Sequence, residues 1–492
     1  MKKLFVALVV FTSAACAPLT TAGPSQIAET KIISSAKARP ASTVNPLDTQ
    51  PPSQANQQES QALIVWQPDP GEVRLRRVDP RSGQDAPNTP VLVLGDSDSG
   101  SILSSLSNDG KLLALTSGTG ISCEPYTGGS RCMGAQDTLT LVNLPHWQMS
   151  EIELPGAGWA SALAFNPDGL RLAMAYHQPE GDKLLLFDTS RSTQLSSREL
   201  PFTPQWVDFT LDGSTLALVG SQPGENPGMS QPEELQLLLL DSASLESLWQ
   251  TSLDGVFSGE WCLENCEGSH EENRFAFYQP GISLSADTTQ LYVIHAGEEV
   301  ITRLDMKEHL SQIIDIQAAQ SWFERLLSLT ATRVQAKIMP VGQIRKGVIS
   351  PDGGTLFIAT QDMTAESPEE IPVLKLQAVD LESGRVVSEA ESLELNFLQG
   401  FSLAPSGDEL LLVGWDQNSS RTEIYDLSLS RLGFLDGWQV SPSRSPKGIP
   451  VLLSSNQGEE RTVLGAVEPE NYEIYDAWVQ EGLAWWPEIN SQ

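Results

Sequence analysis

Two histidines and one tryptophan each close an apolar run of this chain in the same way. The runs read AMAYH, LYVIH and LLVGW, and the closing residues are His177, His295 and Trp415. A neutral imidazole binds divalent metal ions and can act as a base near neutral pH. If the runs are equivalent strands, His177 and His295 are candidates for a shared metal site or base. The alternative is two separate histidines, each hydrogen-bonded or exposed.

Two lysines and two tryptophans form a second candidate group at the start of similar runs. Lys346 opens KGVISPDG and Lys447 opens KGIPVLLSSNQG, while Trp159 and Trp206 stand near the start of two other runs. Cations beside aromatic rings suit an anionic or sugar-like ligand held by charge and stacking. The alternative is that the tryptophans pack in the core and the lysines are solvated.

Other reaction chemistry is sparse in the sequence. There is no Gly-rich phosphate loop, no G-x-S-x-G elbow and no H-E-x-x-H pair. GDSDSGS at 95–101 is a fragment of a calcium loop without its distal Glu, and we expect a turn there. We therefore predict no catalytic residue, no metal ligand and no cofactor, with calcium or another divalent ion as the alternative.

The five cysteines divide into two local pairs and one single residue. Cys123 and Cys132 enclose CEPYTGGSRC, and Cys262 and Cys266 enclose CLENC. Local pairs in loops of an exported protein predict disulfides. A zinc site is disfavoured because no further thiols or paired histidines stand nearby.

The single cysteine, Cys16, ends an export signal. Two lysines precede the apolar run LFVALVVF and the small residues TSAAC, which is the layout of a secretory signal. The segment resembles a bacterial lipoprotein signal, which implies that Cys16 is lipid-modified. Ser13 departs from that pattern, since Leu is usual three residues before the cysteine. Cleavage near Ala17 by an ordinary signal peptidase is the alternative.

The expected location follows from this reading. Residues 1–16 are a lipoprotein-like signal peptide, and 17–60 are rich in Ala, Ser, Thr, Pro and Gln, as in a disordered tether. We expect a lipoprotein anchored to a membrane of the cell envelope, periplasmic or on the surface, with secretion as the alternative. The net charge of −33 argues against nucleic acid and anionic lipid surfaces as partners.

Beyond residue 60 the chain repeats itself. Eight strand-like runs end in Asp or Asn, at Asp79, Asn143, Asp188, Asp241, Asp305, Asp380, Asp426 and Asp476. Most follow a hairpin whose turn contains a glycine, at Gly110, Gly169, Gly213, Gly353 and Gly407. Repeats of about 45–75 residues with about four strands each predict a β-propeller. We expect an all-β domain over 61–492.

The number of blades depends on the two ends of the repeat region. Complete repeats lie near 102–154, 159–200, 205–253, 281–316, 345–395 and 400–440. Residues 61–95 contain three strands and lack the inner one. Residues 448–487 supply another repeat, with YEIYD as its third strand and LAWWP as its outer strand. This counting favours eight blades; seven is the alternative if the last segment completes the first blade.

The hairpins carry a resemblance. SPDGGTLFIAT at 350–360 and NPDGLRLAMAY at 166–176 resemble the repeats of bacterial YVTN and WD40-like propellers. Thr288 departs from the pattern where Gly is usual, and Ser406 where Asp is usual. The motif marks a turn and no catalytic residue, and the resemblance implies scaffolds, binding proteins and a few enzymes.

The longest insertions all fall at one end of the predicted propeller, opposite the glycine turns. They are 118–137, 220–234, 254–280, 317–344 and 361–372, and we expect a short helix near 317–330. This placement favours a non-catalytic propeller that binds a protein or glycan partner, or an anionic one, through its loop-rich end. The alternatives are a hydrolase or lactonase with a metal or histidine site at the channel mouth, and an envelope assembly scaffold.

Overall fold

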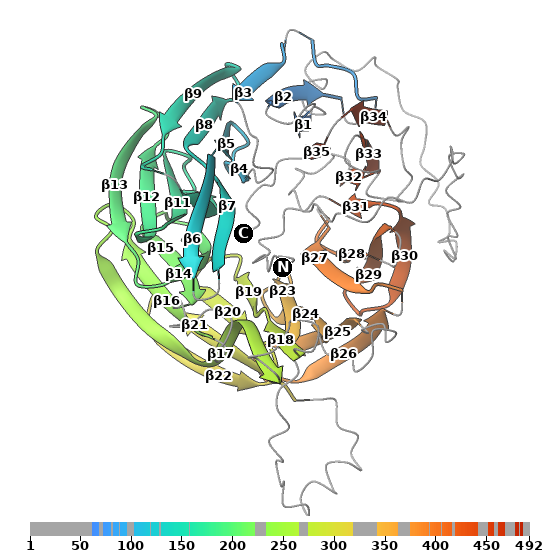
Figure 1. Cartoon of the computed structure of the whole chain (residues 1–492). Helices are drawn as coiled ribbons and strands as arrows, with labels where there is room; N and C mark the ends of the chain where they lie inside the picture. Colours follow the sequence, from blue (N-terminus) through green and yellow to red (C-terminus); the bar gives the residue numbers. More distant parts are fainter. Residues whose placement is uncertain are drawn as a thin grey trace, which may run out of the picture.

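The structure is a computed structural model (Figure 1). It describes residues 62–485 apart from 68–71, 80–81, 88, 96–102, 119, 127–128, 157, 222–232, 265–273, 318–341, 363–373, 393, 405, 416–418, 441–450, 457–460, 468–477 and 482. The signal peptide, the tether and the helix expected near 317–330 lie outside the described residues. Within the described ranges every regular element is a strand, so none of them contains a helix able to cross a membrane.

Eight antiparallel sheets of four or five strands surround a common centre, which confirms the all-β propeller (Figure 1). From the inner to the outer strand, blade 1 is β35 (Leu483–Trp485), β1 (Ala62–Gln67), β2 (Val73–Val78) and β3 (Leu92–Gly95). Blade 2 is β4 (Ser104–Leu106), β5 (Leu112–Ser117), β8 (Thr138–Asn143) and β9 (Gln148–Glu153). Blade 3 is β10 (Trp159–Phe165), β11 (Arg171–Gln178), β12 (Gly181–Asp188) and β13 (Thr193–Glu199). Blade 4 is β14 (Thr203–Phe209), β15 (Thr215–Ser221), β16 (Glu233–Asp241), β17 (Ser247–Glu264) and β18 (Arg274–Tyr278).

The remaining blades follow the same order. Blade 5 is β19 (Gly281–Leu284), β20 (Gln290–Ile294), β21 (Val300–Asp305) and β22 (Leu310–Asp315). Blade 6 is β23 (Gln343–Ile349), β24 (Thr355–Asp362), β25 (Leu374–Asp380) and β26 (Val386–Ser392). Blade 7 is β27 (Phe397–Leu403), β28 (Glu409–Trp415), β29 (Ser420–Asp426) and β30 (Arg431–Asp436). Blade 8 is β31 (Gln439–Val440), β32 (Val451–Asn456), β33 (Arg461–Val467) and β34 (Trp478–Glu481), and a separate hairpin pairs β6 (Gly120–Tyr126) with β7 (Gly129–Ala135).

The core lies between the blades rather than inside any one of them. Successive side chains of a strand point to opposite faces of its sheet, so each second strand is apolar on both faces. In β11, Leu172 and Met174 pack against blade 2, while Ala173 between them packs against blade 4. Eight such clusters fill the eight junctions around the ring.

In blades 2 to 7 the Asp or Asn that ends the third strand caps the turn that follows it. Oδ1 of Asp241 accepts hydrogen bonds from the backbone N–H groups of Ala243 and Ser244. These bonds lower the pKa of the Asp241 carboxyl, because they favour its charged form. Four residues after the cap, the chain takes a positive φ, which only glycine adopts without strain. The residues at this point in blades 1 to 6 are Gly83, Trp147, Ser192, Leu245, His309 and Gly384.

The turns between first and second strands lie at the same end, and neighbouring turns touch. The five predicted turn glycines all have positive φ, between 66° and 79°. Thr288, which stands where a glycine was expected, also has a positive φ, of 56°. Its Oγ1 accepts a hydrogen bond from the backbone N–H of Leu211 in the turn of blade 4, at 2.5 Å. The substitution therefore adds an interblade hydrogen bond that glycine would not supply.

Two strand assignments near the C-terminus were wrong, although the count of eight blades stands. LAWWP does not form the outer strand of blade 8; β35 within it is the inner strand of blade 1, where it pairs with β1. The third position of blade 8 belongs to β33 instead of YEIYD, and Asp476 lies outside the described residues. Blade 1 therefore combines three strands from the N-terminal end of the described chain with β35 from its C-terminal end, and this shared sheet closes the ring.

Candidate functional site

Two inserted hairpins lie at the end of the propeller where second strands end and third strands begin. We call this end the loop face and the opposite end the turn face. The β6–β7 hairpin connects β5 to β8, contacts β10 and lies over the neighbouring strands in Figure 1. Strand β17 runs on beyond blade 4 and pairs with β18, which contacts β23 of blade 6. This ribbon therefore connects blade 4 to blade 6. The described parts of 118–137 and 254–280 lie on the predicted face.

His177 belongs to a cross-strand group at the loop face of blade 3. Trp159, His177 and Asp182 stand opposite one another on β10, β11 and β12. The ring centroids of Trp159 and His177 are 3.9 Å apart, and Nδ1 of His177 is hydrogen-bonded to the carboxylate of Asp182. The other Asp182 oxygen accepts from the hydroxyl of Thr203 in blade 4, at 2.8 Å. The group holds two blades together through a buried carboxylate.

His295 is surrounded differently. It is buried after β20 of blade 5, and its Nε2 is 2.8 Å from the hydroxyl of Thr302 in the same blade. Burial, and then the nearby positive charge of Arg345, lower the pKa of the imidazole to about 4, so His295 is neutral at pH 7. A shared metal or base would require His177 and His295 to meet. They lie on blades 3 and 5, with blade 4 between them.

Arg345 holds a loop of the neighbouring blade. Its side chain has no exposed surface, although it stands on the inner strand β23. Nη2 contacts the carboxylate of Glu299 at 2.7 Å, Nη1 donates to the carbonyl of Glu298 and Nε donates to Gln343. This guanidinium therefore fixes the loop between β20 and β21.

The lysines and tryptophans do not form a ring of equivalent positions. Lys346 and Trp206 occupy the same position of their inner strands, four residues before the turn, and both are partly buried. Trp159 stands three residues earlier in its strand than Trp206 does. Lys447 lies outside the described residues, and β32, which follows it, is a second strand and not an inner one. The predicted equivalence of Lys346 and Lys447 was therefore wrong. Trp415 ends β28, opposite Ser420, and is partly buried.

Sequence reasoning missed a repeated irregularity of the inner strands. In β10, β14 and β27 the pairing register shifts by one residue, which leaves Ser161, Gln205 and Gln399 as bulge residues without a cross-strand partner. A bulge redirects one side chain, and bulges are common next to binding sites. Gly220 and Gly414 stand opposite two of the bulges, where an added Cβ would lie 2.2 Å and 2.4 Å from a backbone oxygen. These glycines were the available sequence signal.

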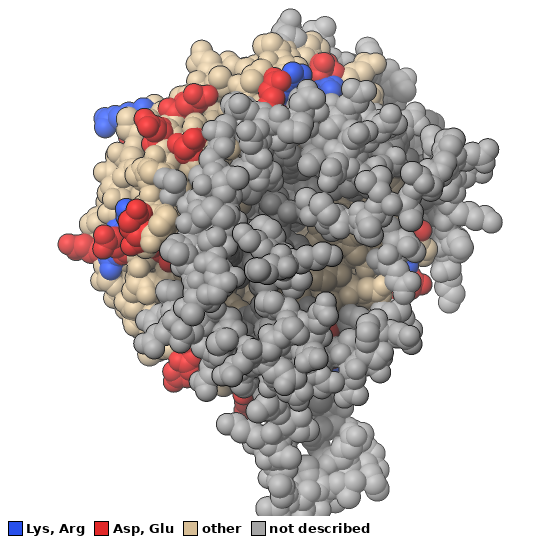
Figure 2. Space-filling view, in the orientation of Figure 1, with Lys and Arg blue, Asp and Glu red and all other residues tan. Residues whose placement is uncertain are grey.

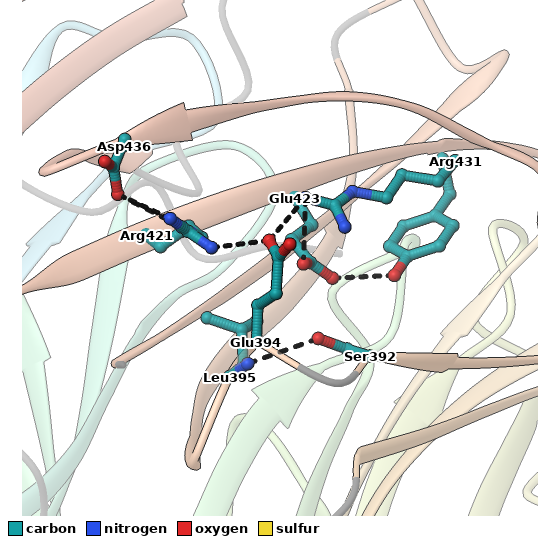
Figure 3. A network of polar contacts seen from close by, with 8 residues as sticks. Ser392, Glu394, Leu395, Arg421, Glu423, Arg431 and Asp436 are labelled. Atoms are coloured by element: carbon teal, nitrogen blue, oxygen red, sulfur yellow. Dashed lines mark hydrogen bonds and ion pairs between the residues drawn. The ribbon is translucent and has the colours of Figure 1, made fainter. Parts of the chain in front are cut away.

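A second missed feature is the charged network on blade 7 (Figure 3). Glu394, in the connection from blade 6, accepts from Arg421 at 2.5 Å and from Arg431 at 2.7 Å. Glu423 is fully buried on β29, accepts from the hydroxyl of Tyr425 at 2.6 Å and lies 3.4 Å from Arg431. Burial, and then the charge of Glu423, raise the pKa of the Tyr425 phenol. The network fastens the blade connection to blade 7.

The cysteines and the acidic residues are the remaining candidates for metal ligands. Cys123 and Cys132 are directly opposite in the register of β6 and β7. Cys262 stands in β17, while Cys266, Cys16 and the calcium-loop fragment 96–100 lie outside the described residues. In the described part of the chain, no group of three or more His, Cys, Asp and Glu side chains could hold a metal ion.

Figure 2 shows groups of Asp and Glu along the rim, with some Lys and Arg beside them.

Comparison with known proteins identifies the fold class. No protein-family model matches the sequence, and no curated protein matches it. The dihydro-heme d1 dehydrogenase NirN, solved in complex with DHE, has a TM-score of 0.52 at 10% identity over 86% of this chain and 74% of that chain. The Cps50 (Swd1) β-propeller domain of Myceliophteria thermophila has a TM-score of 0.40 at 12% identity over 77% of this chain and 96% of that chain. At such low identity the first likeness supports the fold alone: the chain is a β-propeller protein with eight blades.

Proposed function

We propose that this protein is an exported, membrane-anchored β-propeller that binds a protein partner through its loop face. The observation that carries the proposal is the position of the two inserted hairpins. Both extend from the loop face, and both contact inner strands of other blades. Binding residues commonly stand on loops held by a rigid scaffold. The two histidines that would form a shared catalytic or metal site make separate contacts, His177 with Asp182 and His295 with Thr302.

Site-specific photo-crosslinking in the native host tests this proposal. A photoreactive amino acid replaces Glu180, which is exposed on the loop face, or Leu170, which is 57% exposed on the turn face and is the matched control. We expect a discrete protein adduct from position 180 and none from position 170. The same adducts from both positions, or no adduct from position 180, would refute partner binding at the loop face.

The finer features of the proposal rest on sequence and register. Lipid modification of Cys16 is supported by the signal layout, and Cys16→Ser should move the protein from the membrane fraction to the soluble fraction. A disulfide between Cys123 and Cys132 is supported by their opposed positions in the β6–β7 hairpin. Mass mapping of the unreduced protein should recover the two cysteines in one linked peptide. The second pair, Cys262 with Cys266, is proposed on spacing, and kinship with YVTN and WD40-like repeats on the turn motifs.

A further inference from the structure

The outer strand of blade 5 differs from the outer strands of the neighbouring blades. The edge of a sheet offers backbone N–H and C=O groups to other chains, and proteins commonly block such edges with bulges or charges. Among blades 2 to 7, only β9 and β22 pair with the third strand without a register shift. β9 carries the exposed residues Glu151 and Glu153, whereas β22 reads LSQIID and has no charge before Asp315. Of these six strands, β22 alone lacks both a bulge and a charge over its first five residues.

Two of the most exposed apolar side chains in the described part of the chain lie on β22. Leu310 is 64% exposed and Ile313 is 59% exposed. They stand on opposite faces of the strand, because successive side chains alternate. Figure 1 shows β22 at the outer rim of the propeller. An additional strand laid along β22 would therefore cover apolar surface on both of its faces.

The backbone hydrogen bonds define which groups of β22 point outward. The N–H of Ile316 donates to the carbonyl of Glu299 in the same blade, at 2.8 Å, so Ile316 faces inward. In an antiparallel ladder, residues that exchange hydrogen bonds with the partner strand alternate with residues that do not. The even-numbered residues of β22 therefore bond to β21. The N–H and C=O groups of Ser311 and Ile313 point away from the sheet.

The same edge already accepts another segment where it meets blade 6. The N–H of Gln317 donates to the carbonyl of Gly384 at 2.8 Å, and its C=O accepts from the N–H of Val386 at 3.0 Å. An added Cβ at Gly384 would lie 2.6 Å from the carbonyl oxygen of Asp315, so the turn of blade 6 closes that end of the edge. In the described ranges, β22 pairs with no strand other than β21. The stretch before Asp315 is therefore open.

An aromatic contact holds the other end of the edge. The ring of His309, the exposed residue before β22, stacks on Trp249 of blade 4, with centroids 5.4 Å apart and an interplanar angle of 17°. The contact fixes the entry of the chain into β22. An edge that is ordered before binding loses less conformational entropy when a partner adds to it.

The charges around β22 favour a basic partner over a second copy of this chain. Glu298, Glu308 and Asp315 are exposed near the two ends of the strand, and Lys307 is the one lysine or arginine between residues 304 and 316. Two copies, each with a net charge of −33, would bring these carboxylates together and repel each other. A segment with basic ends would instead be attracted.

We propose that the open edge of β22 binds a short, apolar, extended segment of another protein, with basic residues at its ends, as an added strand of blade 5. Main-chain hydrogen bonds to Ser311 and Ile313 supply affinity, and contacts with Leu310 and Ile313 select apolar side chains. This surface is separate from the loop face, because it lies on the outer strand of a blade and uses neither inserted hairpin.

Fluorescence anisotropy with a labelled peptide tests the inference on the full exported chain. The probe is a soluble peptide with a central Val-Ile-Val sequence, flanking threonines and a lysine at each end. We expect it to bind, and we expect at least about tenfold weaker binding when its core amides are N-methylated or its lysines are replaced by glutamates. N-methylation removes the donors that strand addition requires but keeps the apolar side chains.

Variants of the edge locate the binding site. Ser311→Pro removes an outward N–H and should weaken binding about tenfold. Met149→Pro is the matched control, because Met149 holds the same register position on β9, and it should leave binding unchanged. Ile313→Lys keeps every backbone group and should also weaken binding, since it repels the basic ends of the peptide. Thermal unfolding like that of the unmodified protein checks that each variant is folded.

Four results would overturn the inference: no binding of the unmodified peptide, equal binding of the N-methylated peptide, an equal loss in Met149→Pro, or unchanged binding in both Ser311→Pro and Ile313→Lys. A concentration-dependent dimer that Ser311→Pro abolishes would also overturn it, because a second copy would then occupy the edge. Peptide binding at β22 without a crosslink from position 180 would contradict only the loop-face proposal.

Discussion

Thr288 gives the sharpest test of how neighbouring blades are joined at the turn face. Its side chain is buried, its φ is 56°, and its hydroxyl accepts the backbone N–H of Leu211 at 2.5 Å. Thr288→Val keeps the volume and the β-branch, and therefore keeps the backbone strain, but it leaves that N–H without its acceptor. An unsatisfied backbone donor costs about 1–3 kcal/mol. Leu211 is itself 53% exposed, so we expect the lower part of that range, about 1–2 kcal/mol.

Thr288→Gly distinguishes the effect of the lost hydroxyl hydrogen bond from the effect of the backbone strain at the positive φ. It loses the same hydrogen bond, but it also removes the cost of a left-handed conformation, about 1–2 kcal/mol for a residue with a Cβ. The order of stability should therefore be wild type, then Thr288→Gly, then Thr288→Val, measured by urea unfolding followed by tryptophan fluorescence. Wild-type stability of Thr288→Val, or a glycine variant less stable than the valine variant, would refute the argument that the hydroxyl compensates for the strain.

Three further predictions concern other residues of the fold. Glu423→Ala should lower the free energy of unfolding by about 2–3 kcal/mol. The loss is smaller than for a fully buried ion pair, because Arg431 keeps its contact with the carboxylate of Glu394. The double variant with Arg431→Leu should lose less free energy of unfolding than the two single variants lose together. Gly414→Ala should cost about 3 kcal/mol by forcing a Cβ against a backbone oxygen, whereas Gly433→Ala, with no atom within 4 Å, should be near neutral; equal melting temperatures would contradict this. The lowered pKa of Asp241 means that its stabilising contribution is fully present above the ordinary carboxyl pKa and is lost as the pH falls through the lowered value. Asp241→Asn should therefore unfold with a smaller dependence on acid pH, and an unchanged pH profile would contradict the capping role.

Much of the propeller could be predicted because its determinants are local. A residue such as Asp241 caps its own turn, and a residue such as Gly353 supplies the positive φ of its own hairpin, so both features are readable without knowledge of the neighbouring blades. Ring closure was not readable in the same way. Assigning LAWWP to the outer strand of blade 8 satisfied every local rule, and only the pairing of β35 with β1 decided otherwise.

The candidate site depended on contacts between blades, which no local pattern specifies. The sequence marked His177 and His295 as ionisable residues near strand ends, and the structure places His177 near the end of β11 and His295 directly after β20. Whether such residues meet depends on the rotation between blades, and here blade 4 separates the two histidines. The bulge residues Gln205 and Gln399 have no composition signal of their own, because a bulge is defined by the partner strand.

The sequence by itself determined the repeat, the turn chemistry and the apolar strands, since each arises from residues within about 45–75 positions of one another. Only the tertiary structure decided which strands close the ring, which cation holds a loop and which polar residues the inner strands present. Those outcomes require segments from different blades to be brought together. Arg345 illustrates the difference: it is a cation on an inner strand, and it is buried by contacts with Glu298 and Glu299 of the neighbouring blade.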